Sequence, residues 1–542
     1  MSESSRIQRE FYVEIIKPSH YDDDGYLIQW FLPFAPANTL GCLYALVDDA
    51  RQRRALGNDV LIVLNAHDEC QRVIPTGKII RRIRAAHGRG VVFLAGIQTN
   101  QIPRAIELAR EFRRYGIQVV IGGFHVSGCF AMLREPPDDI KTLQDLGVVL
   151  FLGEAEGRMD SLLQDAYHET LRPVYNYLGD PPDLRGQPTP FLPAPIARRY
   201  VLFSTFDAGR GCPFQCSFCT VVNVHGHASR FREADDVEGL VRASLDRGIR
   251  RLFVTDDNMA RNKNWEPIFD RLITLREQEG VRLKLMMQVD VLAHKIPRFV
   301  EKATRAGCNR VFLGIESINP QNLTAAGKLH NHVDEYRDAL LAWRSHKVIT
   351  YAGYIIGFPW DTPESIERDI ETIKRELPID ILEFFILTAL PGSADHRLLW
   401  EQKAWLEPDL NKYDAEHVTF RHRNMSEDRW QEIYRRAWHL YYTPEHIETI
   451  LRRAKADGAG LHHVADAILA FYGSYRSEHL HPLECGILRR KVRRLRRPGL
   501  PRENPVIFYP RRLWETLTTG VALGRFYLQL ERIRRQVSRA SA

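Results

Sequence analysis

The sequence predicts an α/β protein in which a doubly wound parallel-sheet domain precedes a six-repeat (β/α) partial TIM barrel and a helical C-terminal extension. Two series of alternating apolar strands and amphipathic helices support this prediction, because such alternation indicates parallel sheets covered by helices. The third observation is a proline-rich stretch, with seven prolines from Pro173 to Pro195, that separates the two series. We expect domains at residues 1–170, 200–412 and 413–542, with a linker at 171–199.

Length and composition exclude several classes of protein. The chain has 542 residues, of which 44% are apolar and 26% charged, so it is neither fibrous nor wholly disordered. No apolar run reaches the roughly 18 residues that span a bilayer, and the amino terminus lacks a basic-then-apolar signal region. We therefore expect a cytoplasmic protein whose eight cysteines stay reduced.

The first series occupies the N-terminal domain. An amphipathic helix is expected at Ile102–Tyr115, where apolar residues recur at spacings of three and four. Apolar runs rich in β-branched residues predict the strands of one parallel sheet. The five expected strands are Phe11–Ile16, Asp59–Leu64, Val91–Ile97, Ile117–Gly123 and Val148–Glu154.

The second series predicts the barrel, whose chemistry would lie at the carboxyl ends of its strands. Beyond about Asp414 the pattern becomes helical, with helices expected at Arg429–Tyr442 and Pro444–Gly458. The six expected barrel strands are Tyr200–Phe206, Arg250–Asp257, Lys284–Asp290, Arg310–Glu316, Ile349–Gly357 and Ile381–Leu390.

A cysteine cluster follows the first barrel strand directly. Cys212, Cys216 and Cys219 have the spacing C-x3-C-x2-C within GRGCPFQCSFC. A short loop can turn three thiolates toward one centre, which suits soft-metal or iron-sulfur ligation. Structural zinc would need a fourth protein ligand, for which His225 and His227 are candidates, so a zinc site is the alternative.

The cluster, with Phe218 just before its last cysteine, resembles the signature of the radical S-adenosylmethionine (SAM) superfamily. The resemblance implies that Cys212, Cys216 and Cys219 are catalytic and hold a 4Fe-4S cluster with one iron open to SAM. It also implies reductive cleavage of SAM, which yields methionine and a 5′-deoxyadenosyl radical that abstracts hydrogen from the substrate.

The ends of the later strands also resemble elements of this superfamily. TDDN at 255–258 resembles the position that binds the methionine amino group, and MQVD at 287–290 resembles the segment near the ribose. GIES at 314–317 and GFP at 357–359 resemble elements that line the cofactor, and LPGS ends the sixth strand. The SAM-binding residues that this resemblance implies are Phe218, Asp256, Asp257, Asn258, Gln288, Asp290, Glu316, Ser317 and Gly357.

The N-terminal domain resembles the flavodoxin-like, cobalamin-binding domain of one branch of the superfamily, the class B methyltransferase-like branch. Glycines at strand ends let backbone approach a ligand at the carboxyl edge of the sheet, and GEAEG at 153–157 also matches. The motif D-x-H-x-x-G is absent, which suggests cobalt without a protein histidine ligand. The alternative is a flavodoxin-like domain without cofactor. The implied cobalamin-binding residues are Gly96, Thr99, Gly122 and Gly123.

The C-terminal extension begins with Lys412–Trp438, which resembles the segment after the barrel in bacterial members of the branch, and Ser426 is expected to cap a helix. The segment Arg489–Arg502 has eight Lys or Arg and no acid. It is interpreted either as a solvated or disordered tail or as a contact for anionic lipid headgroups. The apolar residues that support a lipid contact are Ile507, Phe508, Tyr509 and Trp514.

Together the resemblances imply a cobalamin-dependent radical SAM enzyme, first of all a methyltransferase for an unactivated carbon of a small-molecule or lipid substrate. A one-electron donor such as flavodoxin or ferredoxin is implied, and no nucleic-acid partner is expected. One alternative is a radical SAM cyclase or rearrangement enzyme without methyl transfer. Another is a zinc-stabilised binding protein without catalysis. From the basic segment we also expect that the cytoplasmic protein associates peripherally with a membrane.

Overall fold

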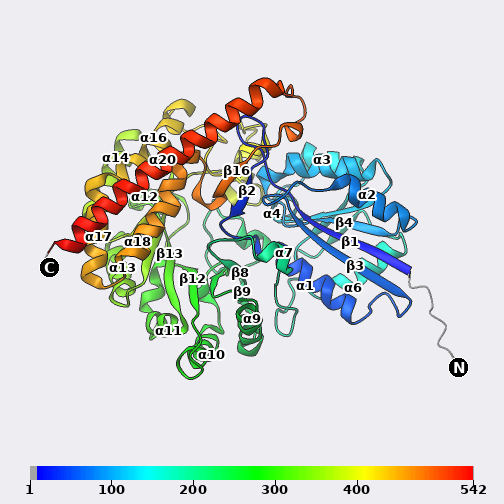
Figure 1. Ribbon diagram of the computed structural model, residues 1–542, viewed down its shortest axis with the longest axis horizontal. Coiled ribbons are helices and arrows are strands. Elements are labelled where there is room, and N and C mark those ends of the chain that lie inside the picture. The colour runs from blue at the N-terminus through cyan, green and yellow to red at the C-terminus, as the bar shows by residue number, and fades with distance from the viewer. Residues whose placement is uncertain (1–8, 541–542) are drawn as a thin grey trace.

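The computed structural model describes residues 9–540, and its N-terminal domain is a parallel sheet with helices on both faces (Figure 1). The strand order β3-β1-β4-β5-β6-β7 places β1 inside the sheet, with the chain growing outward on either side. Tyr12 of β1 pairs with Val63 on one side and Gly90 on the other. This order confirms the doubly wound fold. The strands are β1 (Arg9–Lys17), β3 (Val60–Asp68), β4 (Gly90–Leu94), β5 (Gln118–Gly122), β6 (Val149–Leu152) and β7 (Val174–Asn176).

Two apolar cores lie on opposite faces of this sheet. α3 buries Ile102, Ala105 and Phe112 on one stripe, as the sequence periodicity predicts. Helices α2, α3 and α5 contribute to one core, and α1 and α6 contribute to the other. The helices are α1 (Asn38–Gln52), α2 (Thr76–Ala85), α3 (Ile102–Arg113), α4 (Phe124–Met132), α5 (Asp138–Asp145) and α6 (Met159–Tyr167).

The proline-rich segment differs from the expected linker at 171–199. Its first part forms the edge strand β7, in which Val174 pairs with Leu150 of β6. Its last part contains the short helix α7 (Ala194–Ala197). Pro173 lies just before β7, and its carbonyl accepts a hydrogen bond from the Leu150 N–H. Proline has no backbone N–H, but at the start of an edge strand no ladder hydrogen bond is lost. The N-terminal sheet therefore extends past residue 170.

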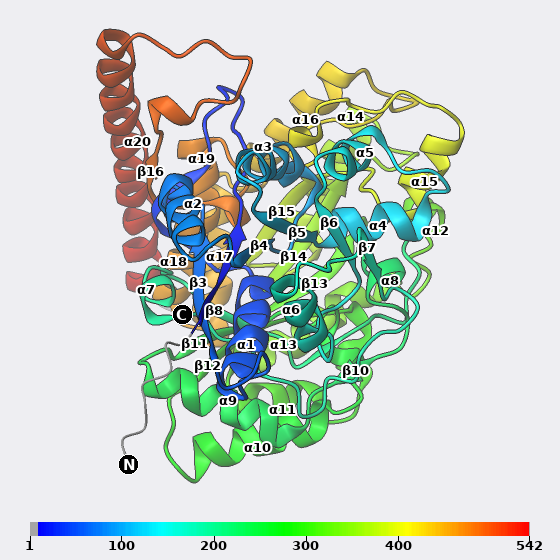
Figure 2. The ribbon, with the colours of Figure 1, turned by 90° about the vertical axis from the view of Figure 1, so that its right-hand side faces the viewer.

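The second domain is a six-stranded parallel sheet with the order β15-β14-β13-β12-β11-β8. The edge strands β8 and β15 do not pair, so the sheet is an open, partial barrel, as predicted. In Figure 2 the N-terminal domain lies in front of the barrel. The strands are β8 (Ser204–Phe206), β11 (Arg251–Val254), β12 (Lys284–Val289), β13 (Cys308–Glu316), β14 (Ile349–Ile356) and β15 (Ile381–Ile386). The helices between them include α9 (Ala234–Asp246), α10 (Trp265–Glu277), α11 (Phe299–Ala306), α12 (Pro320–Ala325), α13 (Tyr336–Ser345) and α14 (Pro363–Glu376).

The C-terminal part is helical and includes one strand that returns to the N-terminal domain. That strand, β16 (Gly486–Arg490), pairs antiparallel with β2 (Gln29–Pro33). Ser426 caps α16 as predicted, because its side chain accepts a hydrogen bond from the Arg429 N–H. The long helix α20 ends the described chain and crosses the molecule (red in Figure 1). The helices are α15 (Ala394–Glu401), α16 (Glu427–Tyr441), α17 (Pro444–Asp457), α18 (Leu461–Ile468), α19 (Ser474–Glu478) and α20 (Pro505–Arg539).

The basic segment Arg489–Arg502 is not a disordered tail, which corrects the first interpretation. Arg489 lies 2.6 Å from Asp22, and Lys491 lies 2.8 Å from Asp24. Phe508 is buried against the Tyr26 ring, so it is not available for a lipid contact. Several of these cations are therefore neutralised within the molecule. No helix in the described part of the chain is long and apolar enough to cross a bilayer.

Candidate functional site

The cysteine loop lies at the carboxyl end of the barrel strands. The Gly211 N–H donates to Asp257, which follows β11, at 2.7 Å. The Ser217 N–H donates to the Ala326 carbonyl after β13, at 2.9 Å, and Asn223 donates to the Gly392 carbonyl after β15, at 2.8 Å. Segments that follow three different strands therefore hold the loop in place. The two-stranded ribbon of β9 (Gly209–Arg210) and β10 (Arg230–Phe231) closes its base.

Cys212, Cys216 and Cys219 are partly buried free thiols of this loop. Burial raises the pKa of Cys216 to about 11 and that of Cys219 to about 12, and it also raises the pKa of Cys212. The nearby ammonium of Lys328 partly opposes this effect at Cys216. Thiols of this kind lose their protons when a metal centre binds, because the thiolate is the ligand.

The donor set fits an iron-sulfur cluster better than a single zinc ion. No group of three or more His, Cys, Asp or Glu side chains within residues 9–540 is close enough to hold one metal ion. A four-iron cube spreads its thiolate ligands over separate irons, so it does not need such close convergence. His225 is turned to Asp257 at 3.0 Å, and His227 is exposed. The zinc hypothesis is therefore not supported by the side-chain geometry.

Asp257 and His225 form a pair beside the cysteine loop. The carboxylate of Asp257 accepts from the Gly211 N–H and from the His225 ring. Burial opposes protonation of the imidazole, but Asp257 outweighs it and raises the pKa of His225. The ring also packs edge-on against Phe124 of α4, with centroids 4.8 Å apart. His225 therefore lies between the cysteine loop and the N-terminal domain.

The other predicted residues after β11 and β12 form hydrogen bonds among themselves. Asp256 accepts from the Ala208 N–H at 2.6 Å, and burial raises its pKa to about 7. Asn258 donates to Asp290 at 2.9 Å, and Arg261 forms two hydrogen bonds with the same carboxylate. Gln288 donates to the Asp256 backbone carbonyl. This arrangement brings the TDDN and MQVD segments together and fixes their side chains.

The predicted residues at the end of β13 combine an ion pair with an unusual backbone conformation. Glu316 has a φ of +65°, a region that non-glycine residues rarely adopt. Its carboxylate lies 2.5 Å from the ammonium of Lys328, which is the cation near Cys216. Ser317 is buried and accepts a hydrogen bond from the Asn319 N–H. Of this group, Glu316 is the residue connected to the cysteine loop.

The cysteine loop packs on the end of β14, where Phe218 contacts the residue that follows Gly357. The Phe218 ring packs edge-on against Phe358, with centroids 5.9 Å apart. Gly357 has a φ of +115° and lies under the Trp430 indole, which would be 1.9 Å from an added Cβ. Trp430 also donates to the Ile356 carbonyl at 3.0 Å. The α16 helix of the extension therefore packs directly on the GFP turn.

A cavity of about 400 Å³ lies between the N-terminal domain and the cysteine loop. Its wall from the N-terminal domain includes three of the predicted glycines, Gly96, Gly122 and Gly123. Thr99 is not part of the lining, and its hydroxyl lies 3.1 Å from the ring of His125. Gly123 also has a packing role, because an added Cβ would lie 2.2 Å from the Ile97 nitrogen. The wall from the barrel consists of Asp207, Arg210, Val224, His225, Thr255 and Asp257.

A buried charge network joins the two walls of this cavity. Arg210 lies 2.6 Å from Glu154, 2.7 Å from Glu156 and 3.1 Å from Asp207. Arg230 forms a second ion pair with Glu154. Burial opposes ionisation of Glu154, but Arg210 and Arg230 lower its pKa to about 2. Ion pairs therefore hold the GEAEG segment to Arg210, which lies two residues before Cys212.

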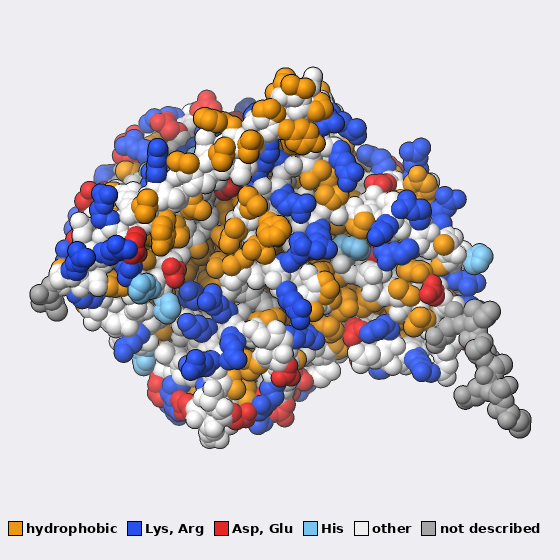
Figure 3. Space-filling model, in the orientation of Figure 1, with side chains coloured by type: hydrophobic (Ala, Val, Ile, Leu, Met, Phe, Trp, Pro, Cys, Tyr) orange, Lys and Arg blue, Asp and Glu red, His pale blue; other side chains and the backbone are white. Residues whose placement is uncertain are grey.

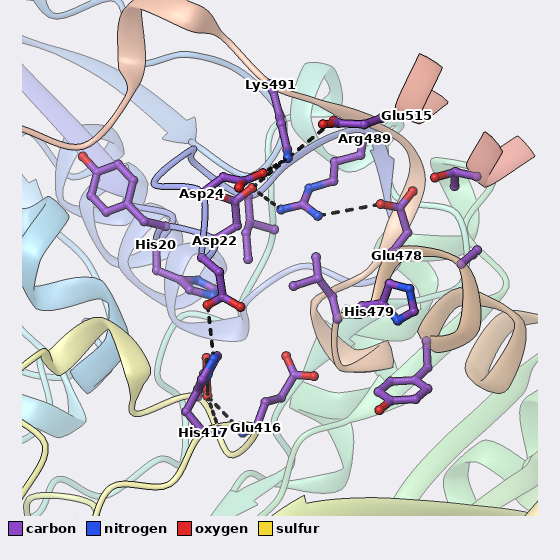
Figure 4. Close-up of a pocket in the computed structure, with 18 of the residues that line it drawn as sticks. His20, Asp22, Asp24, Glu416, His417, Glu478, His479, Arg489, Lys491 and Glu515 are labelled. Atoms are coloured by element: carbon purple, nitrogen blue, oxygen red, sulfur yellow. Dashed lines mark hydrogen bonds and ion pairs between the residues drawn. The ribbon is translucent and has the colours of Figure 1, made fainter. Parts of the chain in front are cut away.

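A second cavity of about 630 Å³ lies between the N-terminal domain and the C-terminal extension. Its charges are paired across the cavity walls. Figure 4 shows Arg489 and Lys491 directed toward Asp22. His417 lies 3.1 Å from Asp23. Burial raises the pKa of Glu416 well above its usual value. This cavity contains none of the cofactor-binding residues predicted from the sequence.

Sequence reasoning missed several residues around the loop. Arg210 and Lys328 make the ion pairs described above, and Arg261 lies 5.4 Å from the Phe214 ring. Arg210 is adjacent to the motif in GRGC, so its position was visible in the sequence. Its partners Glu154 and Glu156 were not, because they lie more than 50 residues earlier in the chain. No signal in the sequence marked Lys328.

Comparison with known proteins matches residues 208–373 to the model of the radical SAM superfamily. The chain is 27% identical over 344 residues to bacteriochlorophyllide d C-12(1)-methyltransferase of Chlorobaculum tepidum, an alignment covering 62% of this chain and 71% of that protein. It is 26% identical over 316 residues to the hopanoid C-2 methylase of Rhodopseudomonas palustris, covering 57% of this chain and 56% of that protein. The matched residues include the cysteine loop and four of the six barrel strands, β11, β12, β13 and β14.

Two solved structures share the whole architecture. The methyltransferase TsrM of Kitasatospora setae, solved with cobalamin and a [4Fe-4S] cluster, aligns with a TM-score of 0.58 at 15% identity. That alignment covers 85% of this chain and 100% of TsrM. The radical enzyme OxsB, solved with aqua-cobalamin, aligns with a TM-score of 0.56 at 12% identity, covering 97% of this chain and 83% of OxsB. These likenesses confirm the fold, and the family match shows that residues 208–373 form a radical SAM domain.

Proposed function

We propose that this protein is a cobalamin-dependent radical SAM methyltransferase that acts on an unactivated carbon of a small-molecule or lipid substrate. The observation that supports it most directly is the 400 Å³ cavity, whose walls are the glycine-bearing strand ends on one side and, on the other, residues that flank the cysteine loop, Arg210, Val224 and His225. A group bound by the N-terminal domain would lie beside the residues that flank the cysteine loop. The relatives named above are a methyltransferase and a methylase, which supports the same reaction class.

Each set of residues has a defined task in this proposal. Cys212, Cys216 and Cys219 would hold a 4Fe-4S cluster, and the strand ends that surround them would bind SAM. Gly96, Gly122 and Gly123 would admit the cobalamin ring close to the backbone. When bound, these groups supply a SAM-derived radical for hydrogen abstraction and a methyl group for transfer to carbon.

The surrounding side chains position and protect this chemistry. Asp257 orients both the cysteine loop and the His225 ring through its two hydrogen bonds. The cavity wall is mainly apolar, with Leu43, Leu46 and Phe151 among its residues, and such a wall excludes water from a reactive radical. The predicted SAM and cobalamin contacts of individual residues remain part of the proposal.

The proposed partners follow from the same reaction. Reductive chemistry at the cluster needs a one-electron donor, for which we propose flavodoxin or ferredoxin. We also propose that the cytoplasmic protein contacts a membrane peripherally to meet a lipid substrate. The basic segment alone is poorly suited to that contact, because Arg489, Lys491 and Arg497 are paired within the molecule.

The test is anaerobic reconstitution with iron, sulfide and cobalamin, followed by addition of dithionite and SAM. We expect the purified chain to bind cobalamin and to form 5′-deoxyadenosine and S-adenosylhomocysteine, detected by chromatography. Cys216→Ala should lose cluster absorption and deoxyadenosine together, because one iron loses its ligand. Cys308→Ala is the matched control, since Cys308 is a buried thiol at the start of β13, away from the loop.

The outcomes separate the proposal from its rival. Deoxyadenosine without S-adenosylhomocysteine, in a protein that binds no cobalamin, would contradict methyl transfer and favour a cyclase or rearrangement enzyme. Ala155→Phe tests the cofactor site independently of turnover, because Ala155 lines the cavity and the larger ring would fill it. We expect cobalamin absorption to be lost in this variant while the iron content stays unchanged.

A further inference from the structure

The outward face of α20 is an apolar stripe that no other part of the described chain covers. Trp514 is 69% exposed, Leu517 55%, Val521 52% and Leu528 66%. Their spacings of three, four and seven residues place them on one side of the helix. Val506, Ile507, Tyr509 and Leu513 extend the stripe toward the start of the helix. Figure 3 shows hydrophobic side chains along the path of this helix.

The stripe does not result from a poorly packed helix. The opposite side of α20 is buried through Phe508, Phe526, Leu530 and Ile533. Lys455 of α17 donates to three carbonyl groups at the helix end, which fixes the last turn. α20 is therefore firmly held on one side and strongly apolar on the other.

The unpaired charges around the stripe are of one sign. From Pro505 to Leu530 the only acidic residue is Glu515, and its carboxylate is paired with Arg511 and Arg512. Glu503 and Glu531, just outside this range, are paired with Arg511 and Arg534. Four arginines near the two ends of the stripe form no ion pair within residues 9–540 and are exposed. They are Arg494 and Arg502 before the helix, and Arg525 and Arg532 on its later turns. Arg525 and Arg532 continue the spacing of Val521 and Leu528, so they flank the same face.

These charges decide which partner suits the face. A second copy of the chain would bring arginine-bearing ends together in either orientation, which like-charge repulsion opposes. A surface of anionic headgroups over hydrocarbon matches both features, because the apolar stripe can enter the interface while the arginines remain at headgroup level. Trp514 and Tyr509 are the aromatic types that favour this boundary.

We propose that the outward face of α20, together with these four free arginines, docks the protein on an anionic lipid surface. The helix lies in the plane of the interface, and the stripe from Val506 to Leu528 is about 33 Å long at the usual helical rise. In this proposal, Arg494 and Arg502 are the residues of the basic segment Arg489–Arg502 that take part in the contact.

Apolar side chains next to the helix extend the docking face. Ile487 and Leu488 of β16 are about half exposed, and they line a groove of about 410 Å³ under α20. Leu202, Leu469 and Leu523 form other walls of this groove. The groove therefore adds apolar surface beside the stripe.

The test is flotation of the reconstituted full chain with vesicles of phosphatidylglycerol and phosphatidylcholine, compared with phosphatidylcholine alone. We expect binding to the anionic vesicles that weakens as salt is raised, since screened arginines lose their attraction. Leu517→Glu places a charge in the stripe and should weaken binding about ten-fold or more. Arg525→Ala with Arg532→Ala should weaken binding and reduce its dependence on salt.

Leu398→Glu is the matched control, because Leu398 is an equally exposed leucine, at 54%, on α15. It should bind vesicles like the wild type. Unchanged vesicle binding by Leu517→Glu, or equal binding to neutral and anionic vesicles, would overturn the proposal. So would a wild-type dimer that Leu517→Glu converts to a monomer, because the face would then pair two copies. Deoxyadenosine formation by Leu517→Glu without vesicles should stay normal, which separates this test from that of the proposed function.

Discussion

At the scale of single residues, Glu383 of β15 is a buried carboxyl group whose Oε2 has no hydrogen-bond partner within residues 9–540. Burial raises its pKa to about 8. As pH rises from about 5 to 8, the unfolded chain releases this proton while the folded chain keeps it, so folded stability falls by about 1.4 kcal/mol per pH unit. Glu383→Gln removes this loss, and its melting temperature should exceed that of the wild type increasingly toward pH 8.

The comparison is made by thermal unfolding of the metal-free chain at several pH values. At pH 4 the carboxyl is protonated in the folded chain and mostly protonated in the unfolded chain, so the advantage of the Gln variant should become small. Glu401→Gln on the exposed surface is the control and should show no such trend. A constant difference between Glu383→Gln and wild type at every pH would mean that the carboxyl does not change its proton occupancy on folding.

Single residues also show where sequence reasoning is strong and where it fails. Cys212, Cys216 and Cys219 could be found because their chemistry depends on spacing within one short loop. The partners of Asp256 and Asn258 could not, because these side chains bond to residues on neighbouring strands whose register the sequence does not specify. The positive φ of Glu316 could not be predicted either, because glycine is the residue that indicates such a conformation in a sequence.

At the scale of elements, the contact of α16 with the end of β14 depends on Gly357. An alanine there would place Cβ 1.9 Å from the Trp430 ring and would also have to adopt a φ of +115°. We expect Gly357→Ala to lower the free energy of unfolding by about 2 kcal/mol or more, because overpacking and backbone strain add. Thermal unfolding with tryptophan fluorescence measures both the loss and any movement of Trp430.

Gly248→Ala provides the matched control for this variant. Gly248 also has a positive φ, +81°, but an added Cβ would meet nothing within 4 Å. Its substitution therefore measures the backbone cost alone, of about 1 kcal/mol. If both variants lost the same stability, the indole above Gly357 would not constrain the turn, and the proposed packing would be contradicted.

The elements differ in how well the sequence predicted them. All six barrel strands were located because each lies within or beside a mainly apolar run, and β14 is buried along its whole length. The edge strand β7 was assigned to a linker because prolines surround it. The pairing of β16 with β2 joins residues more than 450 positions apart, and β16 carries two arginines in five residues. Neither strand has the apolar pattern that identifies a strand from sequence.

At the scale of the whole molecule, the relation between the two domains depends on ion pairs that only the fold creates. Arg210 is the centre of this contact, since it pairs with Glu154 and Glu156 of the N-terminal domain and Asp207 of the barrel. Asn38 of α1 adds a hydrogen bond to Asp207 at 2.8 Å. The network holds the cysteine loop against the cavity, so the proposed reaction requires its geometry to persist.

Removing the Arg210 charge should therefore loosen the domains as well as destabilise them. Arg210→Gln leaves Glu156 buried without its cation and removes one of two cations from Glu154 and Asp207, and breaking a buried ion pair typically costs 3–5 kcal/mol. We expect faster tryptic cleavage between the domains and weaker retention of cobalamin and iron after gel filtration. Arg53→Gln is the control, because Arg53 forms exposed ion pairs with Asp49 and Asp160 that contribute at most about 1 kcal/mol. Equal protease resistance of Arg210→Gln and Arg53→Gln would contradict this expectation. It would show that apolar contacts alone hold the domains together and that the charge network does not determine how the domains are placed.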